Sequence, residues 1–144
     1  MRKATGLSVL GLGLLAVIPP TEATTVKWQS YDPAVLGQAR QEGRRVLLDF
    51  YADWCIPCRE LDRFTFSDAR VIEATKALVM VKVDLTESGS PEVEELRRQF
   101  GVTGVPELVF LDEQGNEIKE ARVIGYLGPD DFLSHLKRAF KGNL

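Results

Sequence analysis

The chain has 144 residues, 44% of them hydrophobic and 27% charged, with a formal net charge of −3. These values are typical of one soluble globular domain that is large enough to bury a core. The small negative charge gives no reason to expect nucleic acid as a partner.

The first 23 residues have the layout of a secretory signal. Arg2 and Lys3 precede an apolar stretch over 7–18, which Pro19-Pro20 ends, and small residues offer a cleavage site after Ala23. The apolar stretch is shorter than the about 20 residues of a membrane-spanning helix. We therefore expect residues 1–23 to be a signal peptide, or an uncleaved anchor that tethers the protein to a membrane. Residues 24–144 would then form the exported domain.

Hydrophobic periodicity and capping residues predict an α/β domain. The first half should contain a short strand over 24–28, a helix from Asp32-Pro33 to Gly43, a buried strand over 46–52, a helix after Cys55 that turns Leu61 and Phe64 inward, and a second helix capped by Ser67. The second half should contain a strand over 78–84, a helix from Ser90-Pro91 to Gly101, a strand over 107–111, an antiparallel partner over 118–124 and a last helix from Gly128. The expected fold is a central mixed sheet that ends in a β-hairpin and is flanked by helices.

The only two cysteines form the motif Cys55-Ile56-Pro57-Cys58, between a buried strand and a helix. A disulfide that closes so small a loop constrains the unfolded chain little, so redox chemistry explains the pair better than stabilisation does. A helix N-terminus favours the thiolate, and an exposed pair there would be activated for exchange. Cys55 would attack a partner disulfide, and Cys58 would resolve the mixed disulfide.

Two carboxylates are candidates for proton transfer and charge effects near the pair. Asp49 interrupts the apolar run over 46–52, so burial should raise its pKa and let it accept the Cys58 proton. The alternative is that Asp49 faces water at the end of the strand. Asp62 lies one helical turn after Cys58 and either shares a face with it or is a solvated surface charge. Negative charge from both would disfavour the thiolate, which leads to the hypothesis that the domain acts as a reductant.

Two further features are candidates for contact with a partner protein. Trp54 directly precedes Cys55, and Val105-Pro106 precedes the strand over 107–111. A cis bond at Pro106 would offer the Val105 backbone as an edge to a substrate chain. A trans proline at the start of a strand is the more common arrangement, and the sequence alone leaves both open.

With Asp49, Tyr51 to Cys58 and Gly104-Val105-Pro106 in view, the chain resembles a thioredoxin-fold protein. More closely, it resembles the C-terminal periplasmic domain of the DsbD family of thiol:disulfide interchange proteins, over residues 28–140. The resemblance implies that Cys55 is the nucleophile, Cys58 the resolving thiol and Pro106 a cis-proline. It also implies that Asp49 and Asp62 occupy the places of acidic residues near the family's dithiol.

The resemblance also implies the partners. This chain lacks the multi-helix membrane domain of that family, so a separate membrane protein of the DsbD or CcdA type would supply electrons. The clients would be oxidised exported proteins in the periplasm, apocytochrome c among them, and the domain itself would be a monomer without a cofactor beyond its disulfide. Glu107 departs from the threonine that thioredoxins usually carry after the proline, which leaves substrate contacts there open.

Other functions remain as alternatives. A zinc site needs about four ligands, which two cysteines and the distant His135 do not supply, so no metal is expected. A copper(I) carrier could use two thiolates, although Met80 is far away in sequence. A non-catalytic adaptor could keep the fold for binding alone.

Overall fold

The computed structural model describes residue 16 and residues 24–143. The signal peptide or anchor expected over 1–23 therefore lies outside the described residues, apart from Ala16, and stays a prediction. Within the described part of the chain, no helix combines the length and the hydrophobicity that crossing a membrane requires.

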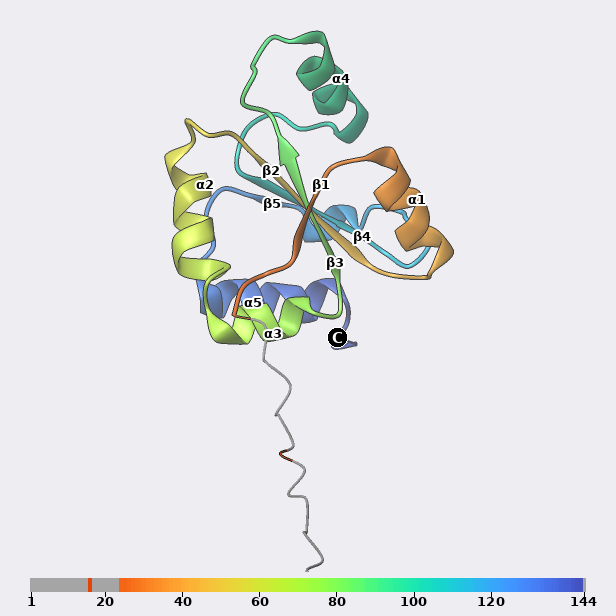
Figure 1. The fold of residues 1–144 in the computed structure, drawn as a ribbon, viewed down its shortest axis with the longest axis vertical. Coiled ribbons are helices and arrows are strands. Elements are labelled where there is room, and N and C mark those ends of the chain that lie inside the picture. The colour runs from red at the N-terminus through yellow and green to blue at the C-terminus, as the bar shows by residue number, and fades with distance from the viewer. Residues whose placement is uncertain (1–15, 17–23, 144) are drawn as a thin grey trace, which may run out of the picture.

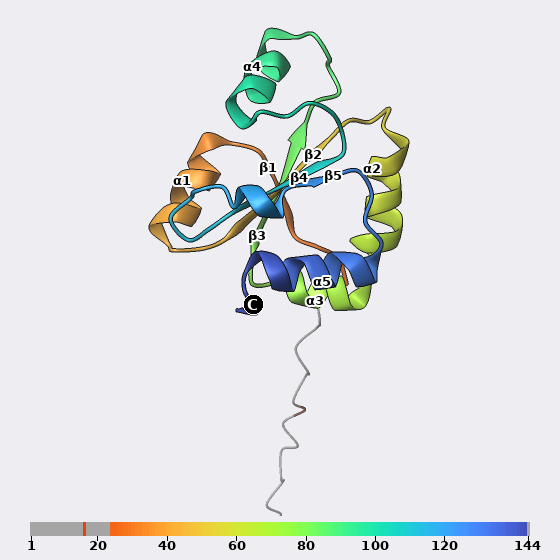
Figure 2. The same cartoon turned by 180° about the vertical axis from the view of Figure 1, so that it is seen from behind.

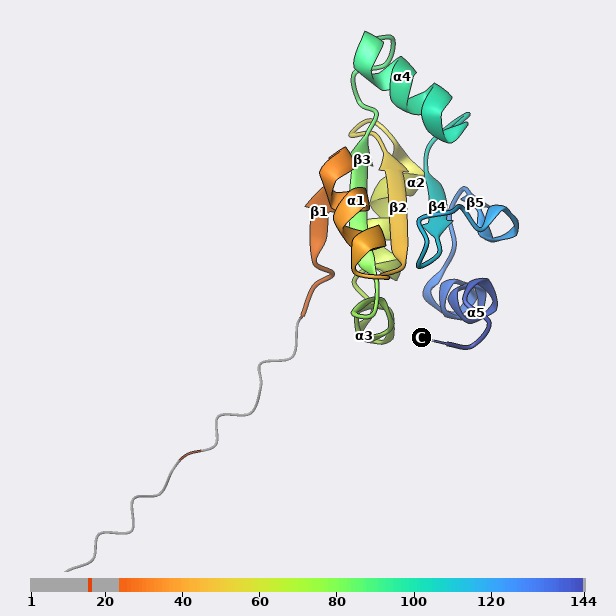
Figure 3. The same cartoon turned by 90° about the vertical axis from the view of Figure 1, so that its right-hand side faces the viewer.

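A mixed sheet of five strands forms the centre of the domain, in the order β1-β3-β2-β4-β5 (Figure 3). The strands are β1 (Trp28–Ser30), β2 (Val46–Tyr51), β3 (Val79–Asp84), β4 (Glu107–Leu111) and β5 (Val123–Ile124). Strands β1, β3 and β2 run parallel, whereas β4 pairs antiparallel with β2, and β5 antiparallel with β4. The expected α/β sheet with a closing hairpin is confirmed.

Helices cover both faces of this sheet. They are α1 (Pro33–Gln41), α2 (Ile56–Glu60), α3 (Ala69–Thr75), α4 (Pro91–Phe100) and α5 (Pro129–Ala139). Helices α1 and α2 lie on opposite sides of the strands (Figure 1), and α3 and α5 run side by side at one end (Figure 2).

Alternation along β2 divides the core into two clusters, because successive side chains of a strand point to opposite faces. Leu47 packs with Leu61 and Phe66 on the face of α2, α3 and α5. Leu48 and Phe50 pack with residues of α1 and α4 on the other face. Asp49 stands between them in sequence, so its side chain points to the α2 face.

Three expected helix boundaries are found where the sequence placed them. Asp32 caps α1, and the Ser90 hydroxyl caps α4 by accepting from the Val93 N–H at 3.3 Å. Gly101 ends α4 in the left-handed conformation with φ of 63°, which glycine adopts without a steric penalty.

The chain after α2 differs from the prediction. Residues Leu61–Thr65 form a π-helical turn, in which the Phe66 N–H bonds to the Leu61 carbonyl. The extra residue in this turn rotates the side chains, so Phe66 enters the core and Phe64, expected inside, is exposed.

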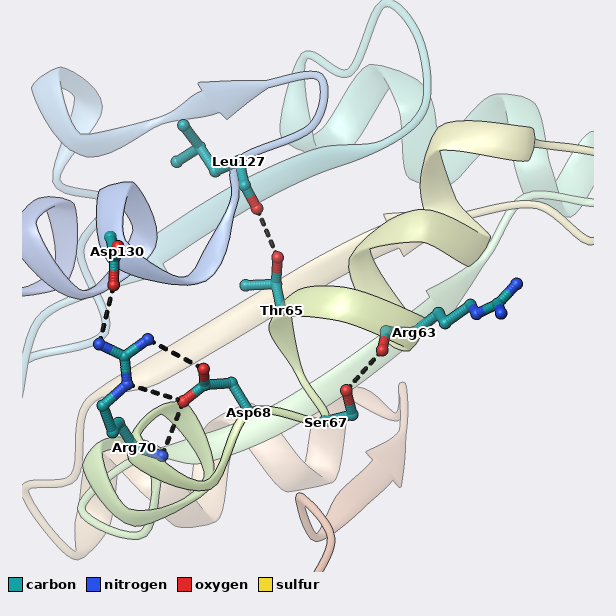
Figure 4. Close-up of polar contacts among 7 residues, drawn as sticks. All are labelled: Arg63, Thr65, Ser67, Asp68, Arg70, Leu127 and Asp130. Carbon is teal, nitrogen blue, oxygen red and sulfur yellow. Dashed lines mark hydrogen bonds and ion pairs between the residues drawn. The ribbon is translucent and has the colours of Figure 1, made fainter.

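Figure 4 shows the polar contacts that connect the π-helical turn and the start of α3 to the segment around the start of α5. The Thr65 hydroxyl donates to the Leu127 carbonyl before α5. Ser67, expected to cap α3, instead donates to the Arg63 carbonyl, and Asp68 is the cap. Arg70 of α3 binds Asp68 and also Asp130 of α5, the latter at 2.8 Å, so α3 and α5 are linked through side chains.

The strands at both edges of the sheet are also shorter than the sequence predicted. Strand β1 begins at Trp28 rather than at residue 24, because its pairing with β3 matches Trp28 to Met80. The arm expected over 118–124 keeps only Val123–Ile124 as a strand, since a 3₁₀ turn over Lys119–Ala121 interrupts it. That turn buries Ala121 against the α5 side of the core.

Candidate active site

Cys55 and Cys58 form a disulfide at the start of α2, so the sequence prediction of a closed pair is confirmed. Cys55 is the N-cap residue of this helix, and its sulfur accepts the Cys58 backbone N–H at 3.2 Å. A free N–H at a helix N-terminus stabilises negative charge. The geometry therefore favours a Cys55 thiolate once the disulfide is reduced.

The disulfide is less accessible than the sequence suggested. We expected an exposed pair, but Cys55 and Cys58 are only 4% and 3% exposed. The side chains of Ala52, Tyr51 and Val105 pack against the two cysteines and account for this burial. Large apolar side chains next to the pair, Trp54 and Ile56, are exposed instead. A partner must therefore approach closely to reach the sulfur atoms.

The loop before the dithiol is anchored to the loop that follows β3. The Trp54 indole N–H donates to the Thr86 carbonyl at 3.2 Å, and the Thr86 hydroxyl accepts the Asp53 N–H at 2.9 Å. Arg59 donates to the Asp53 carbonyl at 2.6 Å. These bonds fix Trp54 with its ring largely exposed. Thr86 could not be predicted from local sequence patterns, since it lies in a polar loop 31 residues after Cys55.

Asp49 is buried as predicted, with 1% exposure. Its Oδ2 binds the Lys82 ammonium at 2.6 Å, and its Oδ1 is buried without a hydrogen-bond partner among the described residues. Burial is the main cause that raises the pKa of Asp49 to about 6, against the opposing effect of Lys82. A carboxylate with this pKa and a vacant lone pair can accept a proton near neutral pH.

Lys82 brings the two predicted carboxylates together. Its ammonium binds Asp62 at 2.6 Å as well as Asp49, although Asp62 is half-exposed. Burial lowers the pKa of Lys82, but Asp49 and Asp62 outweigh it and raise the pKa above its usual value. The rings of Trp28 and Tyr51 lie 4.6 and 4.9 Å from the ammonium.

This cation corrects the sequence-based charge argument. The sequence predicts negative charge from Asp49 and Asp62 near the dithiol, offset in part by Arg59, and Lys82 neutralises one of the two carboxylates. The sequence contained a signal for Lys82, because a lysine that is buried within the predicted strand over 78–84 requires a partner. Its pairing with Asp49 depends on the register of β2 and β3, which places these residues opposite each other.

The Val105-Pro106 peptide bond is cis, as the resemblance implied, and Val105 packs against the disulfide cluster. Neither backbone group of Val105 is hydrogen-bonded within residues 24–143. The Pro106 carbonyl accepts the Gly125 N–H at 3.0 Å, next to the exposed Ile124 of β5. Val105 therefore presents free backbone groups beside the dithiol.

A mixed sheet that positions a disulfide at the mouth of a helix, opposite a cis-proline loop, defines a thioredoxin-type thiol-disulfide oxidoreductase. Across the described part of the chain, no group of three or more His, Cys, Asp or Glu residues has a geometry suited to a metal ion.

Comparisons with known proteins agree with this class. The model of the thioredoxin-like domain family matches residues 33–140. The chain belongs to this family. The DsbD thiol:disulfide interchange protein of Colwellia psychrerythraea is 38% identical over 104 residues, which are 72% of this chain and 17% of that protein. The chain thus spans less than a fifth of that relative.

Solved structures give the same picture. The oxidoreductase DsbH superimposes with a TM-score of 0.69 at 29% identity, over 88% of this chain and 92% of that structure. The oxidised C-terminal domain of Neisseria meningitidis DsbD superimposes with a TM-score of 0.63 at 26% identity, over 74% and 90%. Both the fold and the family resemblance inferred from the sequence are confirmed.

Proposed function

We propose that this chain is an exported protein-disulfide reductase that uses Cys55 and Cys58 to reduce disulfides of periplasmic proteins. One observation carries the proposal: the Cys55–Cys58 pair closes as a disulfide where the Cys58 N–H contacts the Cys55 sulfur. The similarity to DsbD, a thiol:disulfide interchange protein, supports the exchange chemistry, and the signal or anchor expected over 1–23 supports the compartment.

The exchange would run in two steps. In the reduced domain, the Cys55 thiolate attacks one sulfur of a partner disulfide, and the other partner sulfur leaves as a thiolate. Asp49 then takes the Cys58 proton, and the Cys58 thiolate attacks the Cys55 sulfur. The mixed disulfide breaks, the second partner sulfur leaves, and the domain ends oxidised while the partner has gained two electrons.

Partner contacts would come from Trp54 and from the Val105-Pro106 loop. The Trp54 ring is exposed and held by its indole N–H, and the free backbone groups of Val105 lie beside the disulfide. An extended partner chain could pair with Val105 as an added strand does. Such pairing would bring the partner sulfur close to Cys55 despite the limited exposure of Cys55.

The remaining assignments follow from the family. A signal or anchor in residues 1–23 would deliver the domain to the periplasm, and a membrane protein of the DsbD or CcdA type would reduce it again. Oxidised exported proteins, apocytochrome c among them, would be its clients. The domain would act as a monomer with no cofactor beyond its own disulfide.

We expect the reduction potential to lie nearer to about −270 mV, as in thioredoxin, than to the about −120 mV of a strong oxidase. Above pH about 6, Asp49 and Asp62 carry two negative charges against one on Lys82. The excess charge disfavours the thiolate and so favours the oxidised pair. Equilibration with dithiothreitol or glutathione buffers measures the potential, and Asp62→Asn should make it less negative. A wild-type potential near about −120 mV would contradict the proposed direction.

Clients can be identified by trapping. In Cys58→Ala, the first step proceeds but the resolving thiol is missing, so mixed disulfides should accumulate on Cys55. We expect these adducts on non-reducing gels of cells that express the variant, with release by dithiothreitol. The double variant Cys55→Ala/Cys58→Ala is the matched control and should trap nothing. Equal amounts of adduct in both variants would contradict the assignment of Cys55.

A further inference from the structure

Glu107 is a buried charge at the edge of the candidate active site. It follows Pro106 directly as the first residue of β4, and its side chain is 1% exposed. In the pairing of β4 with β2, Glu107 lies opposite Phe50. The Phe50 side chain belongs to the α1 and α4 side of the core. Burying a carboxylate is costly unless charged and hydrogen-bonding partners compensate it. The Glu107 carboxylate therefore requires a cation and hydrogen-bond donors around it.

Arg122 supplies most of the compensation. Its guanidinium binds Glu107 Oε1 at 2.7 Å and Glu117 Oε1 at 2.7 Å. It also donates to the carbonyls of Phe100 at 2.7 Å and of Gly101 at 3.1 Å. These carbonyls end α4, where a cation is favoured by the helix dipole. One side chain from the β5 side of the sheet thus fixes the end of α4 to the start of β4.

The second oxygen of Glu107 holds the loop itself. Glu107 Oε2 accepts the Thr103 backbone N–H at 3.2 Å. The loop over 101–106 is therefore held at Gly101 by Arg122, at Thr103 by Glu107, and at its end by β4. Between the last two points lies Val105, packed against the disulfide with its own backbone groups free.

We propose that Glu107 and Arg122 are positioning residues for protein partners, and this rests on the proposed function. They hold the Thr103–Pro106 loop so that the Val105 backbone is preformed for pairing with a partner chain. Glu107 does not contact the partner, because its carboxylate is buried on the sheet face opposite α2. A preformed edge lowers the ordering cost of binding, which affects the KM for protein disulfides. A small disulfide that needs no backbone pairing would not depend on the loop.

The test compares a protein disulfide with a small one. Glu107→Gln keeps the size of the side chain, but its amide can accept only one of the two donors, Arg122 or Thr103. Arg122→Lys keeps the charge but cannot reach four acceptors from one ammonium. For both, we expect the KM for insulin to rise about fivefold, as when one loop residue must be ordered on binding. The rate with hydroxyethyl disulfide should stay within about 1.5-fold of wild type, since that reaction lacks the ordering step.

Arg45→Gln is the matched control. Arg45 is 20% exposed and pairs with Glu113 at 2.6 Å, much as Arg122 is 19% exposed and pairs with Glu107, but it lies beyond the opposite end of β2. Below its melting temperature, Arg45→Gln should change neither the reaction with insulin nor the reaction with hydroxyethyl disulfide. An unchanged insulin KM in a folded Glu107 or Arg122 variant would overturn the proposal. An equal loss of activity towards insulin and hydroxyethyl disulfide would also overturn it. A wild-type domain inert towards both disulfides would instead overturn the proposed function.

Discussion

Replacement of Cys55 by serine should remove catalysis of disulfide reduction. In the insulin assay with dithiothreitol as reductant, we expect Cys55→Ser to lower the catalysed rate at least about 10³-fold, to the background of dithiothreitol alone. A serine hydroxyl cannot form the mixed disulfide, and the helix N-terminus that stabilises a Cys55 thiolate then has no nucleophile to act on. The Cys58 N–H lies 3.2 Å from the sulfur that this change removes.

The same assay separates the proposed function from its alternatives. Cys58→Ser is the matched control, since it removes a sulfur of the same pair but leaves the first attack intact. It should still react once with a disulfide and then stall as a mixed disulfide. Copper(I) binding by a wild type that lacks exchange activity would favour the carrier, and inactivity in both assays would favour the adaptor. Undiminished turnover by Cys55→Ser would exclude the mechanism.

Replacement of Asp49 by asparagine should slow the resolving step and change its pH dependence. An amide cannot take the Cys58 proton, so we expect release of a mixed disulfide to slow about 10²-fold at pH 7. In the wild type this rate should rise with pH through about 6, because the pKa of Asp49 is raised to about 6. Stopped-flow measurement of resolution from pH 5 to 8 checks this. An unchanged pH profile in Asp49→Asn would rule out Asp49 as the proton acceptor.

The same substitution should stabilise the oxidised protein at neutral pH. The native state keeps the Asp49 proton up to about pH 6, whereas the unfolded chain releases it near the ordinary value of 3.8. The wild type therefore loses about 3 kcal/mol of unfolding free energy as the pH rises from about 4 to above 6. Asp49→Asn lacks this loss, so its stability relative to wild type should increase over that window. Urea unfolding at pH 4 and pH 8 measures the difference, with Asp62→Asn as the half-exposed control.

The local patterns of the sequence were sufficient for most of the fold. Helices α1 and α4 begin and end at the capping residues that the sequence contains, because caps act within one turn. The buried strand β2 was visible as an apolar run, and Asp49 as the charge that interrupts it. The errors fell where tertiary contacts override local pattern. The π-helical turn at Leu61–Thr65 and the broken arm before β5 are set by what packs beside them.

The residues of the candidate site also divide into those that local sequence predicts and those that only tertiary contacts bring together. Cys55 and Cys58 were predicted as a pair because they are three residues apart at the start of one helix, where the helix geometry brings them into contact. Lys82, Thr86 and Arg122 were missed, because each reaches its partner from a different segment of the chain. The sequence predicted that Asp62 lies near the dithiol, but not that it forms an ion pair with Lys82.

By itself, the sequence determined which groups the proposed reaction would use: a dithiol at a helix start, a carboxylate in a buried strand, and a proline loop. Only the tertiary structure decided the environment of that chemistry. The register of β2 against β3 sets Lys82 opposite Asp49, and the packing of Val105 limits access to Cys55. The physical reason is range: caps and periodicity act over a few residues, whereas desolvation and ion pairing depend on segments that folding brings together.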